Sequence, residues 1–156
     1  INISEVLEHV INPIDILKKC YKLLKDDGVL FIMVPNEFNP LQLVNNKINS
    51  KSLNYWIVPY HHYNYFNFDS INNVLGKAKF KSFKTEVSFP MEYLLLSGIN
   101  YVEDREKGKI SHDYVKNFEL NLVNNGFREL KRELYESMAK IGVGRDIMIY
   151  SKKVMD

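Results

Sequence analysis

The 156-residue sequence contains one cysteine, Cys20, so no disulfide bond can form within the chain. Cys20 falls among the apolar positions of a helical pattern, which predicts a buried thiol and fits a reducing compartment. No apolar run approaches the roughly 20 residues that a bilayer-spanning helix needs. The first residues also lack the charged and apolar regions of a signal peptide. We therefore expect a soluble, cytoplasmic protein without a membrane span.

The sequence also lacks a large net charge of either sign. The 21 basic and 19 acidic side chains give a net charge of +2, and the basic residues are scattered rather than grouped. Nucleic acid is therefore not indicated as a partner. The composition, with 46% hydrophobic and 26% charged residues, is that of one ordinary globular domain.

The first part of the sequence alternates between strand-like and helix-like patterns. Residues 1–3 resemble the end of a buried strand, so we expect an incomplete domain whose N-terminal half is missing. Asn12 followed by Pro13 is typical of a helix start, and this helix should stop at residues 26–28. The apolar run at 29–34 predicts a strand buried on both faces of a mostly parallel sheet.

The remaining sequence adds a loop, a helix, two strands and a helical insertion. Residues 36–66 have no clear period and are rich in Asn and aromatic residues, which predicts a long loop over the end of the sheet. Asp69 and Ser70 can cap a helix that ends at Ala78. The alternating residues Phe83, Thr85, Val87 and Phe89 predict a strand over 80–89. Helices are expected at 91–97, 111–124 and 127–140, and a last strand at 145–151. This order predicts an α/β fold with a helical insertion between its last two strands, which pair antiparallel.

Several short motifs occur in a fixed order along the chain. They are Ser4–His9 with Val10, Asn12-Pro13, Leu23-Leu24-Lys25, Gly28, Val34-Pro35-Asn36, Phe89-Pro90-Met91-Glu92 and Ile141–Asp146. Together they resemble the C-terminal half of class I S-adenosylmethionine-dependent methyltransferases. The resemblance implies a Rossmann-like sheet and a partial methyltransferase domain over residues 1–156. It also implies methyl transfer from S-adenosylmethionine to a hydroxyl or other nucleophile of a small molecule, with a sugar as one candidate.

One part of the family pattern is absent from this sequence. The acidic-Gly-x-Gly-x-Gly turn, whose backbone approaches the cofactor at a helix N-terminus, does not occur. We therefore expect the chain on its own to bind the cofactor weakly or not at all, and to be inactive.

Glu5, Glu8 and His9 have the spacing i, i+3 and i+4, which would place all three on one side of a helical turn. The resemblance implies that this turn lies at the cofactor, so the three residues are the expected cofactor-binding residues. An E-x-x-E-H turn in some methyltransferases of this fold binds magnesium together with a further histidine, which here would be His62, or else His61. Oxygen ligands favour Mg or Mn, whereas two imidazoles would admit Zn or Fe. The alternative is that Glu8 and His9 only cap the turn and no metal is used.

A general base is expected among the adjacent histidines His61 and His62. An imidazole suits removal of a hydroxyl proton near neutral pH, and His62 is the preferred candidate. The alternative is a loop histidine whose nitrogens bond to backbone carbonyls or water.

Substrate contacts are expected from Asn36, Trp56 and Tyr60. Asn36 follows a strand end, where ligands of open α/β sheets bind, and aromatic faces suit an apolar or sugar-ring substrate. The aromatic residues could equally form the core of the loop. Arg145 and Asp146 follow two glycines, and a tight turn with an ion pair is favoured there over a role in the pocket.

Two rival functions remain at this point. The chain could be a truncated, non-enzymatic remnant that serves as a binding or oligomerisation module. It could also be a nicotinamide-dependent oxidoreductase, although the Glu-His turn and the Pro-Asn strand end fit the methyltransferase pattern better. The helices within 111–140 carry an apolar face that would serve as a lid or as the face of a homodimer.

Overall fold

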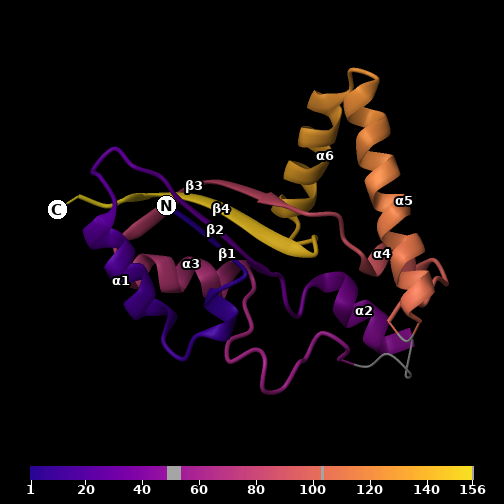
Figure 1. Cartoon of the computed structure of the whole chain (residues 1–156), viewed down its shortest axis with the longest axis horizontal. Helices are drawn as coiled ribbons and strands as arrows, with labels where there is room; N and C mark the ends of the chain where they lie inside the picture. The colour runs from indigo at the N-terminus through magenta and orange to yellow at the C-terminus, as the bar shows by residue number, and fades with distance from the viewer. Residues whose placement is uncertain (49–53, 103, 156) are drawn as a thin grey trace.

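The computed structural model describes residues 1–48, 54–102 and 104–155. Within them, a four-stranded mixed sheet has the order β1-β2-β4-β3 (Figure 1). Strands β1 (Asn2–Ser4) and β2 (Leu30–Pro35) are parallel, and β4 (Asp146–Lys153) runs antiparallel to both β2 and β3 (Phe80–Val87). The carboxyl ends of β1, β2 and β3 therefore meet the start of β4 at one edge of the sheet. This confirms the α/β fold and its antiparallel end.

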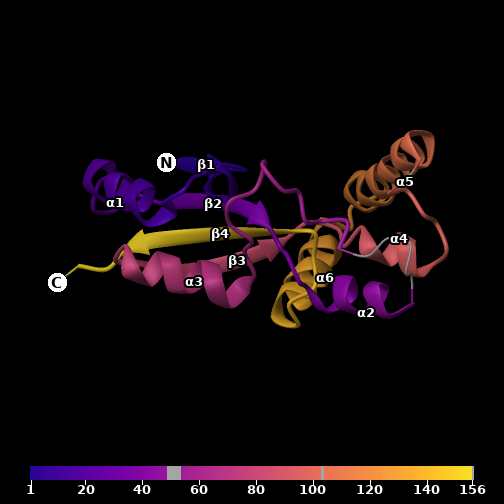
Figure 2. The same cartoon turned by 90° about the horizontal axis from the view of Figure 1, so that it is seen from below.

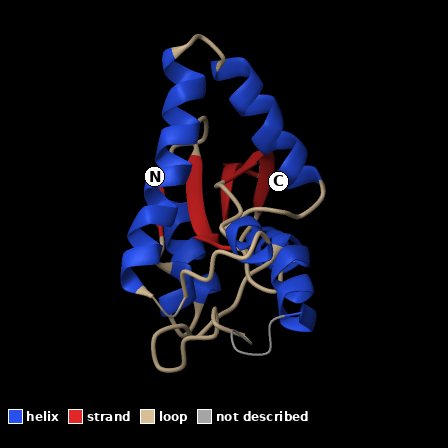
Figure 3. Cartoon of the chain, turned by 90° about the vertical axis from the view of Figure 1, so that its right-hand side faces the viewer, coloured by secondary structure: helices blue, strands red, loops and turns tan. Residues whose placement is uncertain are grey.

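Seven helical segments accompany the sheet in the described residues. They are the 3-10 turn η1 (Leu7–His9) and the α-helices α1 (Pro13–Leu23), α2 (Pro40–Ile48), α3 (Phe68–Lys77), α4 (Glu92–Leu96), α5 (Arg105–Asn124) and α6 (Arg128–Lys140). The helical insertion between β3 and β4 is confirmed as α4, α5 and α6. Helices α5 and α6 form a hairpin that projects beyond the sheet, with a loop at its tip (Figure 3). None of the described helices is long and apolar enough to cross a membrane.

One hydrophobic core joins the sheet to α1 and α3, which lie together along the sheet (Figure 2). Its fully buried members are Leu7, Leu17, Leu30, Ile32, Val34, Ile71, Ile147 and Ile149, and Leu75 is almost as buried. Alternate residues of a strand face opposite sides of a sheet, so the even-numbered residues of β2 enter this core. Cys20 is buried at its margin, as predicted.

The helix starts follow local capping chemistry. The Asn12 side chain accepts a hydrogen bond from the Asp15 amide, which confirms the predicted start of α1 with Pro13 in its first turn. Helix α3 begins earlier than Asp69 and Ser70 suggested, because Asn67 is its N-cap. Asn67 and Ser70 form a reciprocal capping box.

The structure corrects three of the predicted helix and strand boundaries. Helix α5 starts at Arg105 rather than 111, because the Asp104 carboxylate accepts from the amides at 106 and 107, and Gly108 is accommodated inside the helix. Strand β3 ends at Val87 rather than 89. The last strand covers 146–153 rather than 145–151.

Two further expectations, one about a loop and one about the burial of a strand, were wrong. Residues 36–66 are not loop throughout, since they contain α2, in which Gln42 and Asn45 are buried. Strand β2 is not buried equally on both faces, because its odd-numbered residues lie half-buried beside Met148 and Tyr150 of β4.

A β-bulge explains the exposure of Phe83. The register shifts between Ser82 and Lys84, so Phe83 is an extra residue in β3 and its side chain is 57% exposed. The bulge lets both Phe80 and Val87, whose sequence numbers differ by an odd amount, face the buried side. The simple alternation expected for this strand therefore fails at its centre.

Candidate active site at the carboxyl edge of the sheet

A cavity of about 410 Å³ lies at the edge where β1 and β2 end and β4 begins. We call it the edge cavity. The segment after β1, the end of β2, the loop before α3, the insertion and the start of β4 all contribute to it. Its lining residues, in that order, are Glu5, Glu8 and His9; Pro35; Tyr55 and His62; Met91, Tyr101 and His112; and Arg145 and Asp146. Segments far apart in the sequence thus share one polar cavity, at the end of the sheet where open α/β folds bind ligands.

Glu8, His9 and His62 form a cluster in the wall of this cavity. One side-chain ligand atom from each of the three lies within 4.8 Å of the others. The His9 and His62 rings meet edge to face at 4.9 Å, and His9 Nε2 is 3.7 Å from Glu8 Oε1. Two imidazoles and a carboxylate can share a proton or bind a divalent cation.

Backbone hydrogen bonds fasten the loop that carries His62 to the turn that carries Glu8. The Glu8 carbonyl accepts from the amides of Tyr63 at 2.8 Å and Asn64 at 3.1 Å. The Asn64 side-chain amide donates to the carbonyls of Leu7 and Val10. His62 is therefore held against Glu8 by the fold itself, which is the kind of support that keeps a reactive geometry fixed.

Burial changes the acidity of both Glu8 and His62. Glu8 is 2% exposed, and this burial raises the pKa of its carboxyl. For His62, burial followed by the nearby His9 and Arg145 lowers the pKa of the imidazole, so His62 is neutral at pH 7. Among the described residues, neither Glu8 Oε2 nor His62 Nδ1 has a hydrogen-bond partner, although both atoms are buried. Buried polar atoms without partners are uncommon in native proteins and point to a functional role.

A buried polar network supports the opposite wall of the cavity. Glu92, which is fully buried, accepts hydrogen bonds on Oε1 from the Tyr55 hydroxyl at 2.7 Å and from Gln42 Nε2 at 3.2 Å. Arg145 Nη1 lies 3.6 Å from the same oxygen, and the guanidinium lies over the Tyr55 ring at 6.0 Å. Gln42 also donates to Glu37, where burial raises the carboxyl pKa to about 7.

The structure brings together part of the predicted cofactor and metal set. Glu8, His9 and His62 cluster as described, but Glu5 lies outside that cluster. The reason is that the segment is not the helical turn its spacing suggested: Glu5 has φ of 53° and the 3-10 turn begins only at Leu7. Glu5 still lines the cavity, with an exposed side chain.

The structure does not place the predicted substrate contacts in the edge cavity. Trp56 is 1% exposed and packs against Phe38 and Tyr55, so the alternative of a loop core applies to it. Tyr60 is 97% exposed, on a backbone with positive φ. Asn36 is buried, and its amide donates to the carbonyls of Gly142 and Gly144. It therefore braces the turn before β4.

The two adjacent histidines have different environments. The His61 side chain is exposed, and this residue contributes its backbone carbonyl, which lies 2.7 Å from His9 Nδ1. His62 lines the cavity. The geometry therefore favours His62 as the candidate base.

Sequence reasoning missed the second wall of the cavity. Arg145 was assigned to a structural turn with Asp146, but its ion pair is with Glu92, and Asp146 instead accepts from the Ser88 hydroxyl at 2.6 Å. Tyr101 and Glu92 were given no role in the site. A signal did exist for Glu92, because it is the one acidic residue in the otherwise apolar stretch 89–96.

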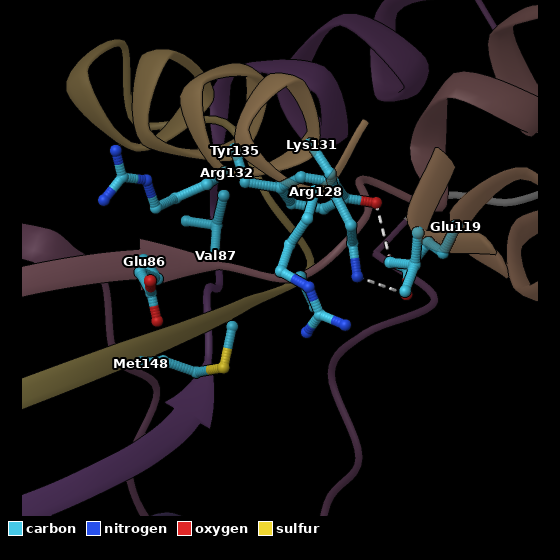
Figure 4. Close-up of a pocket in the computed structure, with 10 residues that line it drawn as sticks. Glu86, Val87, Glu119, Arg128, Lys131, Arg132, Tyr135 and Met148 are labelled. Carbon is cyan, nitrogen blue, oxygen red and sulfur yellow. Dashed lines mark hydrogen bonds and ion pairs between the residues drawn. The ribbon is translucent and has the colours of Figure 1, made fainter. Parts of the chain in front are cut away.

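A second cavity, of about 430 Å³, lies between α6, α5 and the ends of β3 and β4 (Figure 4). The acidic side chains that line it are paired with other side chains of the protein. Glu119 accepts from Lys131 at 2.9 Å and from the Tyr135 hydroxyl at 2.7 Å, and Glu86 pairs with Lys84. These contacts tie α6 to α5, and we treat this cavity as part of the hairpin's packing.

Comparisons with known proteins agree with this architecture. A family described as a methyltransferase domain matches residues 1–84. No curated protein sequence matches the chain. A S-adenosylmethionine-dependent methyltransferase from Archaeoglobus fulgidus has a similar solved structure, with a TM-score of 0.51 and 20% identity, covering 97% of this chain and 57% of that one. The phosphoethanolamine N-methyltransferase 2 of Haemonchus contortus, solved with S-adenosyl-L-methionine, gives a TM-score of 0.50 and 16% identity, covering 99% of this chain and 33% of that one. The chain thus spans less than two thirds of the length of either structure.

Proposed function

Because the chain belongs to the methyltransferase domain family, we propose that its edge cavity receives the acceptor in a S-adenosylmethionine-dependent methyl transfer to a small molecule. The acceptor atom is a hydroxyl oxygen or a comparable nucleophile. One observation carries this proposal: a neutral His62 with a buried, unpartnered Nδ1 lies beside Glu8 in a cavity at the ligand-binding edge of the sheet.

In the proposed reaction, His62 removes the proton of the acceptor hydroxyl. The imidazole takes the proton as the acceptor oxygen forms its bond to the methyl carbon. The methyl donor would leave as a neutral thioether, with the electron pair of the broken carbon–sulfur bond on sulfur. S-adenosylmethionine, when bound, supplies this activated methyl group. Glu8, which has a carboxylate oxygen within 4.8 Å of a ring nitrogen of His62, helps to accommodate the positive charge that His62 acquires.

The residues beside the cofactor are proposed to be Glu5, Glu8 and His9, which follow β1. Glu5 is fixed by a hydrogen bond from its amide to the Met33 carbonyl at 2.9 Å, so this corner is anchored to the end of β2. Rate enhancement in such a site would come mainly from holding the acceptor in line with the methyl group.

A metal ion is an alternative use of the same cluster. The donor set of Glu8, His9 and His62 fits a divalent cation, with two imidazoles and a carboxylate, and this set admits Zn or Fe as well as Mn. A metal-bound His62 cannot also be the base. Loss of activity on chelation, with recovery on adding Mg, Mn or Zn, would support the metal, and insensitivity to chelators would support His62 as the base.

Calorimetric titration of S-adenosylhomocysteine into the intact protein tests the proposed function. We expect binding with a micromolar dissociation constant. The variant Glu8→Gln should weaken it, whereas Glu129→Gln, at an exposed position on α6, should not. Absence of binding would contradict the proposal and favour a non-enzymatic binding module.

A further inference from the structure

The Arg145 guanidinium has hydrogen-bonding capacity that the fold does not use. Its side chain is 31% exposed and lines the edge cavity. Among the described residues, no acceptor takes a hydrogen bond from it, and Nη1 is buried without a partner. A guanidinium carries five donors in a planar fork, so such a group at a cavity wall is available for a ligand.

The carboxylates around Arg145 accept hydrogen bonds from other donors, although among the described residues Glu92 Oε2 is buried without a partner. Glu92 Oε1 accepts from Tyr55 and Gln42, and its contact with Arg145, at 3.6 Å, is a charge contact beyond hydrogen-bonding distance. Asp146 accepts from the Ser88 hydroxyl at 2.6 Å. Glu92 and the Tyr55 ring therefore hold the guanidinium in place without occupying its fork.

Among anions, the charges of the edge cavity disfavour a dianion more than they disfavour a ligand with one negative charge. Arg145 is the only Lys or Arg that lines this cavity among the described residues, whereas three carboxyl groups, Glu5, Glu8 and Asp146, also line it. A dianion such as a phosphate monoester would face these acids with a single cation. A carboxylate matches the planar fork and the single charge.

We propose that Arg145 binds a carboxylate of the methyl acceptor, which makes the acceptor a small hydroxy acid. This inference rests on the proposed function, because the hydroxyl of that acid would face His62 in the same cavity. Arg145 and His62 lie on walls supplied by the turn before β4 and by the loop before α3, and a cavity of about 410 Å³ accommodates one small molecule between them.

The test uses 3-hydroxybenzoate as a probe and its uncharged amide as the matched control. Binding to the intact protein is followed by NMR on the Arg145 side-chain Nε–H signal, assigned by its loss in Arg145→Lys. We expect the acid to shift this signal to saturation and the amide to bind at least tenfold more weakly. Phenyl phosphate should bind more weakly than the acid.

Three variants separate a specific site from general attraction of anions. Because variants at 145 lack the Arg145 signal, their affinity for the acid is measured by calorimetric titration. Arg145→Met should weaken binding of the acid at least tenfold. Arg145→Lys keeps the positive charge beside Glu92 but loses the planar fork. It should therefore fold normally and bind the acid several-fold more weakly. The NMR signal of the lysine ammonium should broaden during the titration rather than shift sharply to saturation. Arg128→Met removes a positive charge outside the cavity and should bind as the wild type does.

Equal affinity for the acid and the amide, tighter binding of phenyl phosphate, unchanged binding in Arg145→Lys, or no binding of the acid would each overturn the inference. Titration of S-adenosylhomocysteine is independent of these measurements. If that ligand binds while 3-hydroxybenzoate does not, the proposed function stands and the hydroxy acid is wrong.

Discussion

His62 and His61 are adjacent residues of the same type, but His62 lines the edge cavity whereas the His61 side chain is exposed. They therefore provide a matched pair of variants. His62→Ala should lower kcat by about 100- to 10,000-fold, because the general base is lost. His61→Ala should retain most activity, since His61 acts through its backbone carbonyl, which accepts from His9. The initial rate of S-adenosylhomocysteine formation at saturating acceptor measures both. Similar losses in the two variants would argue against His62 as the base.

Glu37 makes the stability of the fold depend on pH. Burial raises the pKa of this carboxyl from its ordinary value of 4.5 to about 7, against the opposing effects of Arg145 and Gln42. Between these pH values the unfolded chain releases a proton that the folded chain keeps. Raising the pH therefore favours unfolding, by about 3 kcal/mol over the full interval.

Glu37→Gln should remove this pH dependence while keeping an oxygen that accepts from Gln42. We expect its free energy of unfolding to exceed that of the wild type at pH 8 and to approach it at pH 5, as measured by urea denaturation at each pH. Glu129→Gln, where the side chain is 71% exposed, is the control and should follow the wild type. A parallel decline in the wild type and Glu37→Gln would show that other carboxyls cause the effect.

At the scale of elements, the turn before β4 fits closely against the end of β3. A Cβ atom at Gly144 would lie 2.4 Å from Val87 Cβ, and the Gly144 carbonyl accepts from the Asn36 amide beyond β2. Gly144→Ala should therefore lower the free energy of unfolding by about 2–3 kcal/mol, because buried backbone and Val87 must move. Equilibrium urea unfolding measures this change.

Gly76 in α3 provides the opposite case. A Cβ there would meet nothing within 4 Å. Gly76→Ala should raise the free energy of unfolding by about 0.5–1 kcal/mol, because alanine restricts the unfolded chain and favours the helix. If both alanine variants changed stability alike, the close contact at Gly144 would be refuted.

Elements whose signals are local were predictable from the sequence. Asn12 with Pro13 defines a helix start through its own hydrogen bond, and the apolar run of β2 is unmistakable as a strand. The bulge at Phe83 was not predictable, because it depends on pairing with β4, which lies more than sixty residues away. The start of α5 was missed because Gly108 was interpreted as a break, although a glycine is tolerated within a helix.

The candidate site shows the same difference between features that follow from local sequence and features that depend on distant partners. The Glu8-His9 turn and His62 were found because their residue types suggest chemistry. The burial of Asn36 and Trp56 was not predicted, because it is decided by distant partners, the carbonyls before β4 and the ring of Phe38. Arg145 could not be assigned to the cavity without knowing that β4 pairs with β2 and that the Arg145 guanidinium lies beside Glu92.

At the scale of the whole molecule, the polar chemistry and the helical hairpin lie in different regions. The edge cavity gathers segments at the carboxyl edge of the sheet, whereas α5 and α6 extend away from it and are tied together by Glu119. Among the described residues of the hairpin, only His112 of α5 lines the cavity. A ligand at the cavity should therefore affect distant sequence segments together and leave the hairpin tip unchanged.

Hydrogen–deuterium exchange of the intact protein, with and without saturating S-adenosylhomocysteine, tests this expectation. Amides at 4–10 and 54–64 should exchange more slowly with the ligand, since the first segment borders the proposed cofactor site and Glu8 carbonyl bonds couple the second to it. Amides at 121–130, in the hairpin tip, are the internal control and should exchange at the same rate. Protection of residues 4–10 without protection of 54–64 would mean that the two segments open independently. Protection centred on the hairpin tip would place the ligand away from the carboxyl edge of the sheet.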